Sequence, residues 1–118
     1  MFTQDFTTTR IKLMALSRIR QIEDEWKLNP VGYKKDTREY CDAMYDILDN
    51  MAPERLENIV AELRRSYAEM GMDDEEYIAD SLMTMTLAMY QNEIGEQNVY
   101  DLGWDRLVED FFHSTAAV

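Results

Sequence analysis

Apolar residues recur at intervals of three and four over most of the chain, and glycine and proline stand mainly between these stretches. This spacing is typical of amphipathic helices, and no segment alternates in the way a half-buried strand does. Five helices are expected, and their starts are placed near Thr9, Asp36, Pro53, Asp73 and Asn98. The pattern therefore predicts an all-α fold, a single compact domain of about five helices.

The residues at the expected boundaries have physical reasons to be there. Asn29 precedes Pro30 and is pushed out of the helical region, which ends the first helix near Lys27. Asp36 and Glu39 are spaced as a capping box. Proline suits the first position of a helix, and glycine suits the position after its end. Pro53 is thus expected to begin the third helix, and the helices before Gly71 and Gly95 are expected to stop there.

The apolar face of the expected third helix is the most regular, and it runs from Leu56 to Met70. The fourth helix differs because it is apolar on most sides between Tyr77 and Tyr90. Such a helix lies at the centre of a core or is buried partly by a second subunit. A chain of 118 residues has a thin core, so a symmetric homodimer is predicted.

Length and composition fit one domain over residues 1–118, with 46% hydrophobic residues and one cysteine. The lone Cys41 excludes an internal disulfide and suits a reducing compartment. No apolar run reaches the roughly 18 residues of a membrane span, and the first residues do not have the pattern of a secretory signal. A cytoplasmic protein is expected.

Acidic residues outnumber basic residues 24 to 12, and the net charge is −12. The charge is divided unevenly: residues 1–38 carry eight bases and five acids, and residues 39–118 carry four bases and nineteen acids. The first segment is mildly basic and the acidic helical body follows. The overall charge disfavours direct binding to nucleic acid or to an anionic membrane.

The chain has few residues of the types that bind metals or act as nucleophiles. Zinc sites need several Cys or His ligands, and the chain has only Cys41 and His113. Cys41 is expected to be a packed residue, and His113 a cation near a helix end. Many carboxylate pairs are possible, but no pair is singled out for acid–base catalysis. No cofactor is expected, and the protein is not expected to be an enzyme.

The placement of the acids is more informative. Asp42, Asp46 and Asp49 share one helix face without a base among them, and Asp101, Asp105 and Glu109 do so near the C-terminus. Like charges at this spacing repel by a few tenths of a kcal/mol per pair. The third helix avoids this penalty because arginines accompany Glu54, Glu57 and Glu62. Two interpretations remain open: soluble acidic faces, or carboxylates that imitate DNA phosphates.

The segment from Asp36 onward resembles the Ocr-type antirestriction proteins of phages. The likeness is carried by the stretches DT at 36–37, CDAMYDILDNMAP at 41–53, AEMGMD at 68–73, MYQNEI at 89–94 and YDLGWDRLVEDFF at 100–112. Proteins of this family are all-helical homodimers whose acids imitate bent B-form DNA and occupy the DNA groove of type I restriction-modification enzymes. The resemblance implies that Asp42, Asp46, Asp49, Asp101, Asp105 and Glu109 belong to a mimic surface.

The function expected from these observations is inhibition of a host DNA-binding enzyme of a restriction-modification or related defence system. The full set of expected phosphate-mimic residues is Glu39, Asp42, Asp46, Asp49, Asp73, Asp74, Glu75, Glu76, Asp80, Asp101, Asp105, Glu109 and Asp110. One alternative is a small acidic interaction module that docks on a host protein through an apolar patch. The least favoured alternative is a DNA-binding regulator that uses Arg10, Lys12, Arg18 and Arg20.

Overall fold

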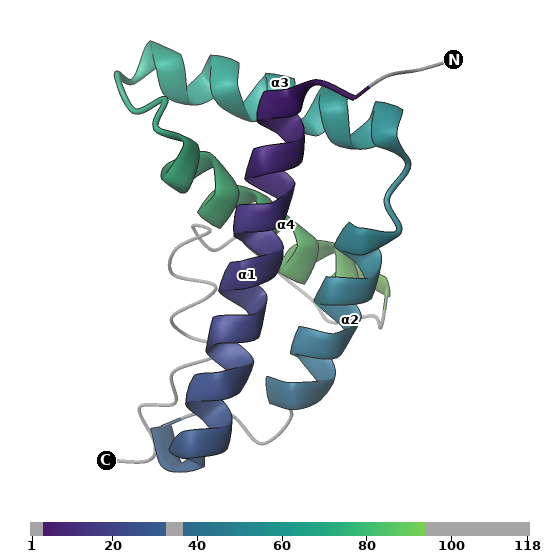
Figure 1. Ribbon diagram of the computed structural model, residues 1–118, viewed down its shortest axis with the longest axis vertical. Coiled ribbons are helices and arrows are strands. Elements are labelled where there is room, and N and C mark those ends of the chain that lie inside the picture. The colour runs from purple at the N-terminus through teal and green to yellow at the C-terminus, as the bar shows by residue number, and fades with distance from the viewer. Residues whose placement is uncertain (1–3, 33–36, 94–118) are drawn as a thin grey trace.

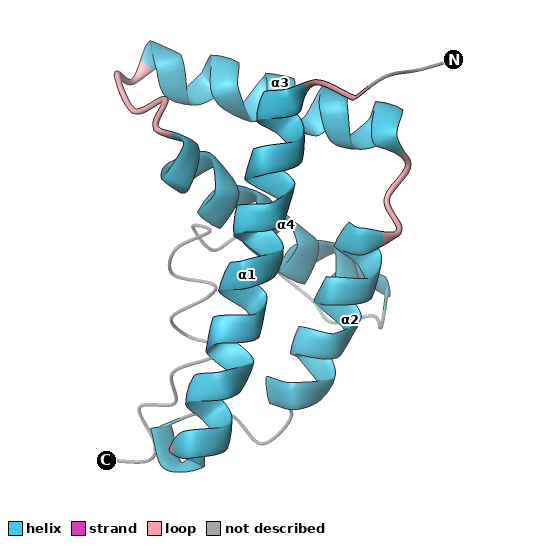
Figure 2. Cartoon of the chain, in the orientation of Figure 1, coloured by secondary structure: helices cyan, strands magenta, loops and turns pink. Residues whose placement is uncertain are grey.

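The computed structural model describes residues 4–32 and 37–93, and every regular element among them is helical (Figures 1 and 2). The elements are α1 (Phe6–Leu28), a single 3₁₀ turn η1 (Pro30–Gly32), α2 (Thr37–Asp49), α3 (Pro53–Glu69) and α4 (Glu75–Glu93). The all-α prediction is confirmed for this part of the chain. The helix expected after Asn98 lies outside the described residues, as do Asp36 and Gly95.

The longest helix, α1, runs along the long axis of the molecule, and the others pack around it (Figure 1). The α2 helix lies beside the C-terminal half of α1, α3 crosses near the N-terminal end of α1, and α4 passes behind it. The α4 helix contacts each of the other three.

One hydrophobic cluster contains side chains from all four α-helices. Its largest fully buried members include Ile11 and Ile19 of α1, Met44 and Leu48 of α2, Leu56 of α3, and Ile78, Leu82 and Leu87 of α4. The buried members from α3 and α4 lie within the apolar ranges that the sequence predicts for these two helices, 56–70 and 77–90. The described helices thus share one core.

The apolar character of α4 is explained by its position in this core. Ten of its nineteen residues are buried, and they include the polar residues Ser81, Thr84, Thr86 and Gln91. Burial on several sides by α1, α2 and α3 accounts for these faces within one chain. The homodimer stays a prediction, and α4 no longer provides an argument for it.

The helix boundaries follow local chemistry. The α1 helix begins at Phe6, three residues before the expected start, and the Asp5 carbonyl already accepts a bond from the Thr9 N–H at 3.0 Å. Pro53 is the first residue of α3, as predicted. The α3 helix ends before Gly71, whose φ of 69° lies in the left-handed region that favours glycine.

Two backbone bonds close this helix end: Gly71 N–H to the Ala68 carbonyl at 3.0 Å and Met72 N–H to the Tyr67 carbonyl at 2.8 Å. This is the paired pattern of a Schellman motif. The apolar face predicted for α3 is not buried at this end of the helix. Met70 is 60% exposed, because the helix stops there and no other described element covers it.

Candidate functional site

The three aspartates of α2 lie on its outer face. Asp42, Asp46 and Asp49 are exposed, as is Glu39 one turn before them. The opposite face of the helix is buried through Tyr40, Cys41, Met44 and Leu48. The 3.6-residue period of the helix thus places the carboxylates on the side away from the core, as the sequence predicts. We call Glu39, Asp42, Asp46 and Asp49 the α2 stripe.

The α2 stripe has no ion pair within the described part of the chain. The pairs found there join Arg10 to Glu75, Arg18 to Asp80, Arg20 and Lys27 to Glu23, and Arg64 to Asp5. Exposed carboxylates of like charge on one helix face keep their negative potential when no cation is paired with them. The stripe is therefore a predominantly negative surface, with Arg38 one helical turn before Asp42 on the same helix.

Two bases of α1 nevertheless lie near the two ends of the stripe, which the sequence does not reveal. The Lys12 ammonium donates to the backbone carbonyl of Asp49 at 3.2 Å. Asp49 is the last residue of α2, so this positive charge also interacts favourably with the negative end of the helix dipole. The Arg20 guanidinium lies 4.1 Å from the centre of the Tyr45 ring and interacts electrostatically with Asp42. Both bases come from a different helix, so the spacing within α2 gives no sign of them.

Between α1 and α2 lies a buried carboxylate beside the only cysteine. The Glu23 carboxylate is almost fully buried and pairs with Lys27 at 3.1 Å and Arg20 at 3.4 Å. Burial raises the pKa of the Cys41 thiol to about 12, and the negative charges of Glu23 and Asp42 act in the same direction. Cys41 is therefore a protonated, packed thiol at neutral pH, which agrees with its expected role.

The second set of expected site residues surrounds the start of α4. Asp73, Asp74, Glu76 and Asp80 are exposed, and Glu75 is half-buried. The Asp74 carboxylate accepts a bond from the Glu76 N–H at 3.0 Å, which satisfies a free donor at the helix start. Part of this cluster therefore serves to cap α4.

Arginines of α1 offset part of this second set. Arg10 donates to Glu75 through Nη2 at 2.5 Å and through Nε at 3.2 Å, and Arg18 Nε lies 3.8 Å from Asp80. These pairs border a groove of about 620 Å³ between α1 and α4, whose apolar lining includes Leu13, Met14 and Ala79. The cluster at the start of α4 thus carries less unbalanced charge than the sequence indicates.

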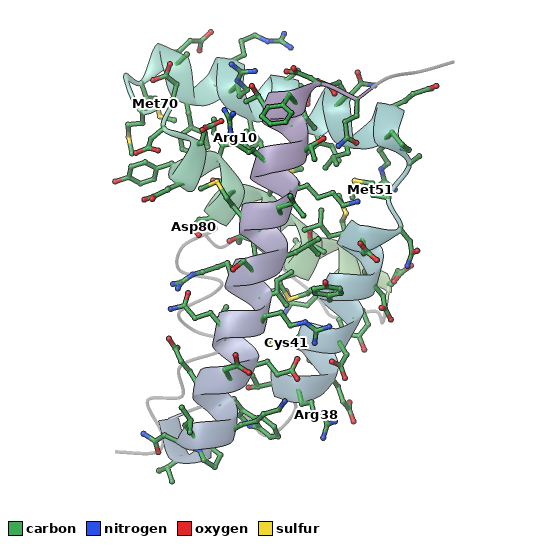
Figure 3. The ribbon with its side chains drawn as sticks, in the orientation of Figure 1. Arg10, Arg38, Cys41, Met51, Met70 and Asp80 are labelled. Carbon is green, nitrogen blue, oxygen red and sulfur yellow. The ribbon has the colours of Figure 1, made fainter. Side chains whose placement is uncertain are left out.

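The two acidic sets do not form one surface. In Figure 3, Arg10 and Asp80 lie on one side of α1, and Cys41 and Arg38 of α2 lie on the other. The contacts agree, because Arg10 and Arg18 face α4 whereas Lys12 and Arg20 face α2. Four further expected site residues, Asp101, Asp105, Glu109 and Asp110, lie outside the described residues.

The four bases that a DNA-binding regulator would need are all engaged within the chain. Arg10 and Arg18 pair with acids of α4, Lys12 binds a backbone carbonyl of α2, and Arg20 lies on Tyr45 and beside Glu23. They also point to two sides of α1, so they do not form one basic patch. This arrangement weighs against the regulator alternative.

One acid of α3 has a role that the sequence does not indicate. The Glu57 carboxylate accepts a bond from the Thr8 hydroxyl at 2.8 Å and another from the Asp5 N–H at 2.9 Å. It therefore holds the start of α1 from a different helix, although the sequence suggests an ordinary solvated face. Its partners lie about fifty positions away in the chain, so no local pattern could reveal them.

Searches for other chemistry give few further features. Within residues 4–32 and 37–93, no group of three or more His, Cys, Asp or Glu side chains is placed to hold a metal ion. None of the helices there is both long and apolar enough to cross a membrane. The chain matches no family model, and no curated protein and no solved structure matches it. The resemblance to Ocr-type proteins therefore stays a prediction that rests on the sequence motifs.

Proposed function

We propose that the protein inhibits a DNA-binding enzyme of a host defence system, of the type I restriction-modification or a related class. The α2 stripe occupies positions in the enzyme that otherwise receive DNA phosphates. The observation that carries the proposal is a row of exposed carboxylates on one helix face with no ion pair among the described residues. Such a row complements the Lys and Arg side chains of a DNA groove.

Charge spacing sets the scale of the imitation. Carboxylates at every third or fourth helical residue are separated by roughly 5 Å along the axis. A DNA duplex carries one charge per about 1.7 Å of axis, and each strand one per about 3.4 Å. The α2 stripe alone is therefore about threefold too sparse for a duplex, and several helices would have to present their acids together. The acids at 101–110 are the candidates for extending it.

The net charge permits a larger imitation when two copies associate. The charge of −12 on one chain equals that of about six base pairs. A symmetric homodimer would carry about −24, equal to about twelve base pairs, which is the scale of a DNA-enzyme footprint. The proposal includes this homodimer and places the protein in the cytoplasm of the host cell.

Competition against duplex DNA tests the proposal. Candidate restriction and defence enzymes are bound to a labelled duplex, and the protein is titrated at two salt concentrations. The proposal predicts displacement of the DNA, with an affinity that falls steeply as salt rises. Binding that leaves the DNA in place, or that does not depend on salt, would contradict it.

A further inference from the structure

The turn between α3 and α4 exposes three large apolar side chains. Met70 is 60% exposed, Met72 38% and Tyr77 50%. The Met72 N–H is bonded to the Tyr67 carbonyl, so the backbone of the turn is fixed at its closing point. The side chains are therefore held on ordered backbone and do not belong to a loose loop.

The connection between the two helices brings these side chains to one end. The Tyr67 hydroxyl of α3 is hydrogen-bonded to the Ser81 hydroxyl of α4. Met70 lies one helical turn after Tyr67, and Tyr77 lies one turn before Ser81. Both therefore lie beyond this contact, on the side of the turn, where Figure 3 places Met70 at the edge of the molecule. We call Met70, Met72 and Tyr77 the turn patch.

The charge around the turn patch is predominantly negative. Residues 66–93 contain seven acids and no base: Glu69, Asp73, Asp74, Glu75, Glu76, Asp80 and Glu93. Of those next to the patch, Glu69, Asp73, Asp74 and Glu76 are exposed, and Glu75 is paired with Arg10. Arg64 and Arg65 share a hollow with Asp73 on the α3 side, and Arg65 shares another with Glu69, so the negative charge of these two acids is partly offset.

We propose that the turn patch is a docking surface for a basic, amphipathic segment of a partner protein. The apolar side chains of that segment pack on Met70, Met72 and Tyr77, and its Lys or Arg side chains face Asp74 and Glu76. Methionine side chains adapt to partners of varied shape, and tyrosine provides a large contact area with a polar tip. An apolar patch with an acidic rim selects a segment that has the opposite charge and an apolar face. This surface is separate from the α2 stripe.

Binding of a model peptide tests this docking surface. The probe is a fluorescent amphipathic helix of about eighteen residues built from Leu and Lys, titrated with the full chain and followed by anisotropy. The double change Met70→Ser and Tyr77→Ser is expected to weaken binding by about tenfold, because two apolar contacts are lost. The matched control is Leu28→Ser with Val31→Ser, at side chains that are 87% and 69% exposed outside this surface, and it should change binding less than about twofold.

A second pair of variants separates local charge from net charge. The double change D74N and E76Q removes the two acids that face the partner, and D42N with D46N removes two from α2. The proposal predicts a loss of about tenfold from the first set and a smaller loss from the second. Equal losses, or no loss from Met70→Ser with Tyr77→Ser, would overturn it.

Sedimentation of the variant Met70→Ser with Tyr77→Ser tests whether a second copy of the chain covers the turn patch. A second copy of the chain could cover the turn patch in place of a partner segment. If Met70→Ser with Tyr77→Ser converted a dimer to a monomer, the patch would be a dimer contact and the proposal would be wrong. An unchanged oligomeric state, together with the loss of peptide binding, supports it.

Discussion

The carboxylate of Glu57 accepts a hydrogen bond from the hydroxyl of Thr8 at 2.8 Å, joining α3 to the first turn of α1. The other oxygen of the same carboxylate accepts from the Asp5 N–H at 2.9 Å. The side chain of Asp5 makes no capping bond of its own. An acid from another helix therefore accepts the N–H of the N-cap residue, as the Glu of a capping box does, and it lies at the positive end of the α1 dipole.

Removal of this carboxylate is expected to destabilise the protein. Glu57→Ala should lower the free energy of unfolding by about 1–2 kcal/mol, the usual cost of losing a cap. Glu54→Ala, at an exposed position on the same helix, should stay within about 0.5 kcal/mol of the parent. Urea unfolding measures both variants, and equal effects would show that the bonds to α1 contribute nothing.

The conformation of Gly71 predicts a cost that comes from the backbone alone. A Cβ at this position would meet no atom within 4 Å, but the φ of 69° disfavours side chains. Gly71→Ala should therefore cost about 1–2 kcal/mol, and Gly71→Asn less, because asparagine tolerates this region better. Thermal unfolding of the two variants measures which of them is less stable. Equal stabilities, or a less stable Gly71→Asn, would show that the turn adopts another backbone conformation without cost.

The burial of Cys41 predicts a loss of stability at high pH. In the unfolded chain the thiol ionises near its ordinary pKa of 9.0, whereas in the fold its pKa is about 12. Unfolding in this window releases a proton, so the stability is complete below pH 9.0 and falls as the pH rises toward 12. The contribution of this group has a slope of at most about 1.4 kcal/mol per pH unit.

The variant Cys41→Ala provides the comparison, since it lacks the titrating group. Its stability should fall less steeply than that of the parent between pH 9 and 11, although its stability at neutral pH is lower because of the cavity. Parallel slopes for the two proteins would contradict the protonated, buried thiol. Urea unfolding at several pH values measures the slopes.

Much of the described fold follows from patterns within single helices. The spacing of apolar residues predicts one face of α1 with Ile11, Ala15, Ile19, Ile22 and Trp26, and all of these except the half-buried Trp26 are buried. Pro53 and Gly71 mark the ends of α3. These features depend on neighbours in the sequence. The sequence predicts a start of α1 three residues too late, because the partner that stabilises this end, Glu57, belongs to another helix.

The candidate site likewise has some features that depend on one helix and others that depend on contacts between helices. Exposure of Asp42, Asp46 and Asp49 follows from the period of α2 and could be predicted. The pairing of Arg10 with Glu75 and of Arg18 with Asp80 could not, because it depends on how α1 packs against α4. For the same reason the sequence treats the acids at 42–49 and 73–80 as one set, whereas α1 separates them.

Removal of the charges of the α2 stripe tests whether this helix imitates DNA phosphates. Single amide substitutions should have little effect, since one exposed pair contributes about 0–1 kcal/mol. The triple change D42N, D46N and D49N should weaken inhibition of the target enzyme clearly and flatten its salt dependence. Folding should be unchanged or slightly improved, because repulsion within the helix is relieved.

The control must remove equal charge from acids that have bases nearby and no structural role. Glu57 is unsuitable because it caps α1. Glu54, Glu62 and Glu69 are exposed on α3, and Arg65 lies beside the last two. The change E54Q, E62Q and E69Q therefore matches the α2 set in charge and in helical setting.

The most direct measurement is displacement of duplex DNA from the target enzyme by these two triple variants and the parent, at low and at high salt. The account predicts a large loss for D42N, D46N and D49N at low salt, a small loss for E54Q, E62Q and E69Q, and convergence of all three proteins at high salt. Equal losses from the two variants would mean that net charge alone governs binding. Full displacement by the α2 variant would contradict phosphate imitation by this helix.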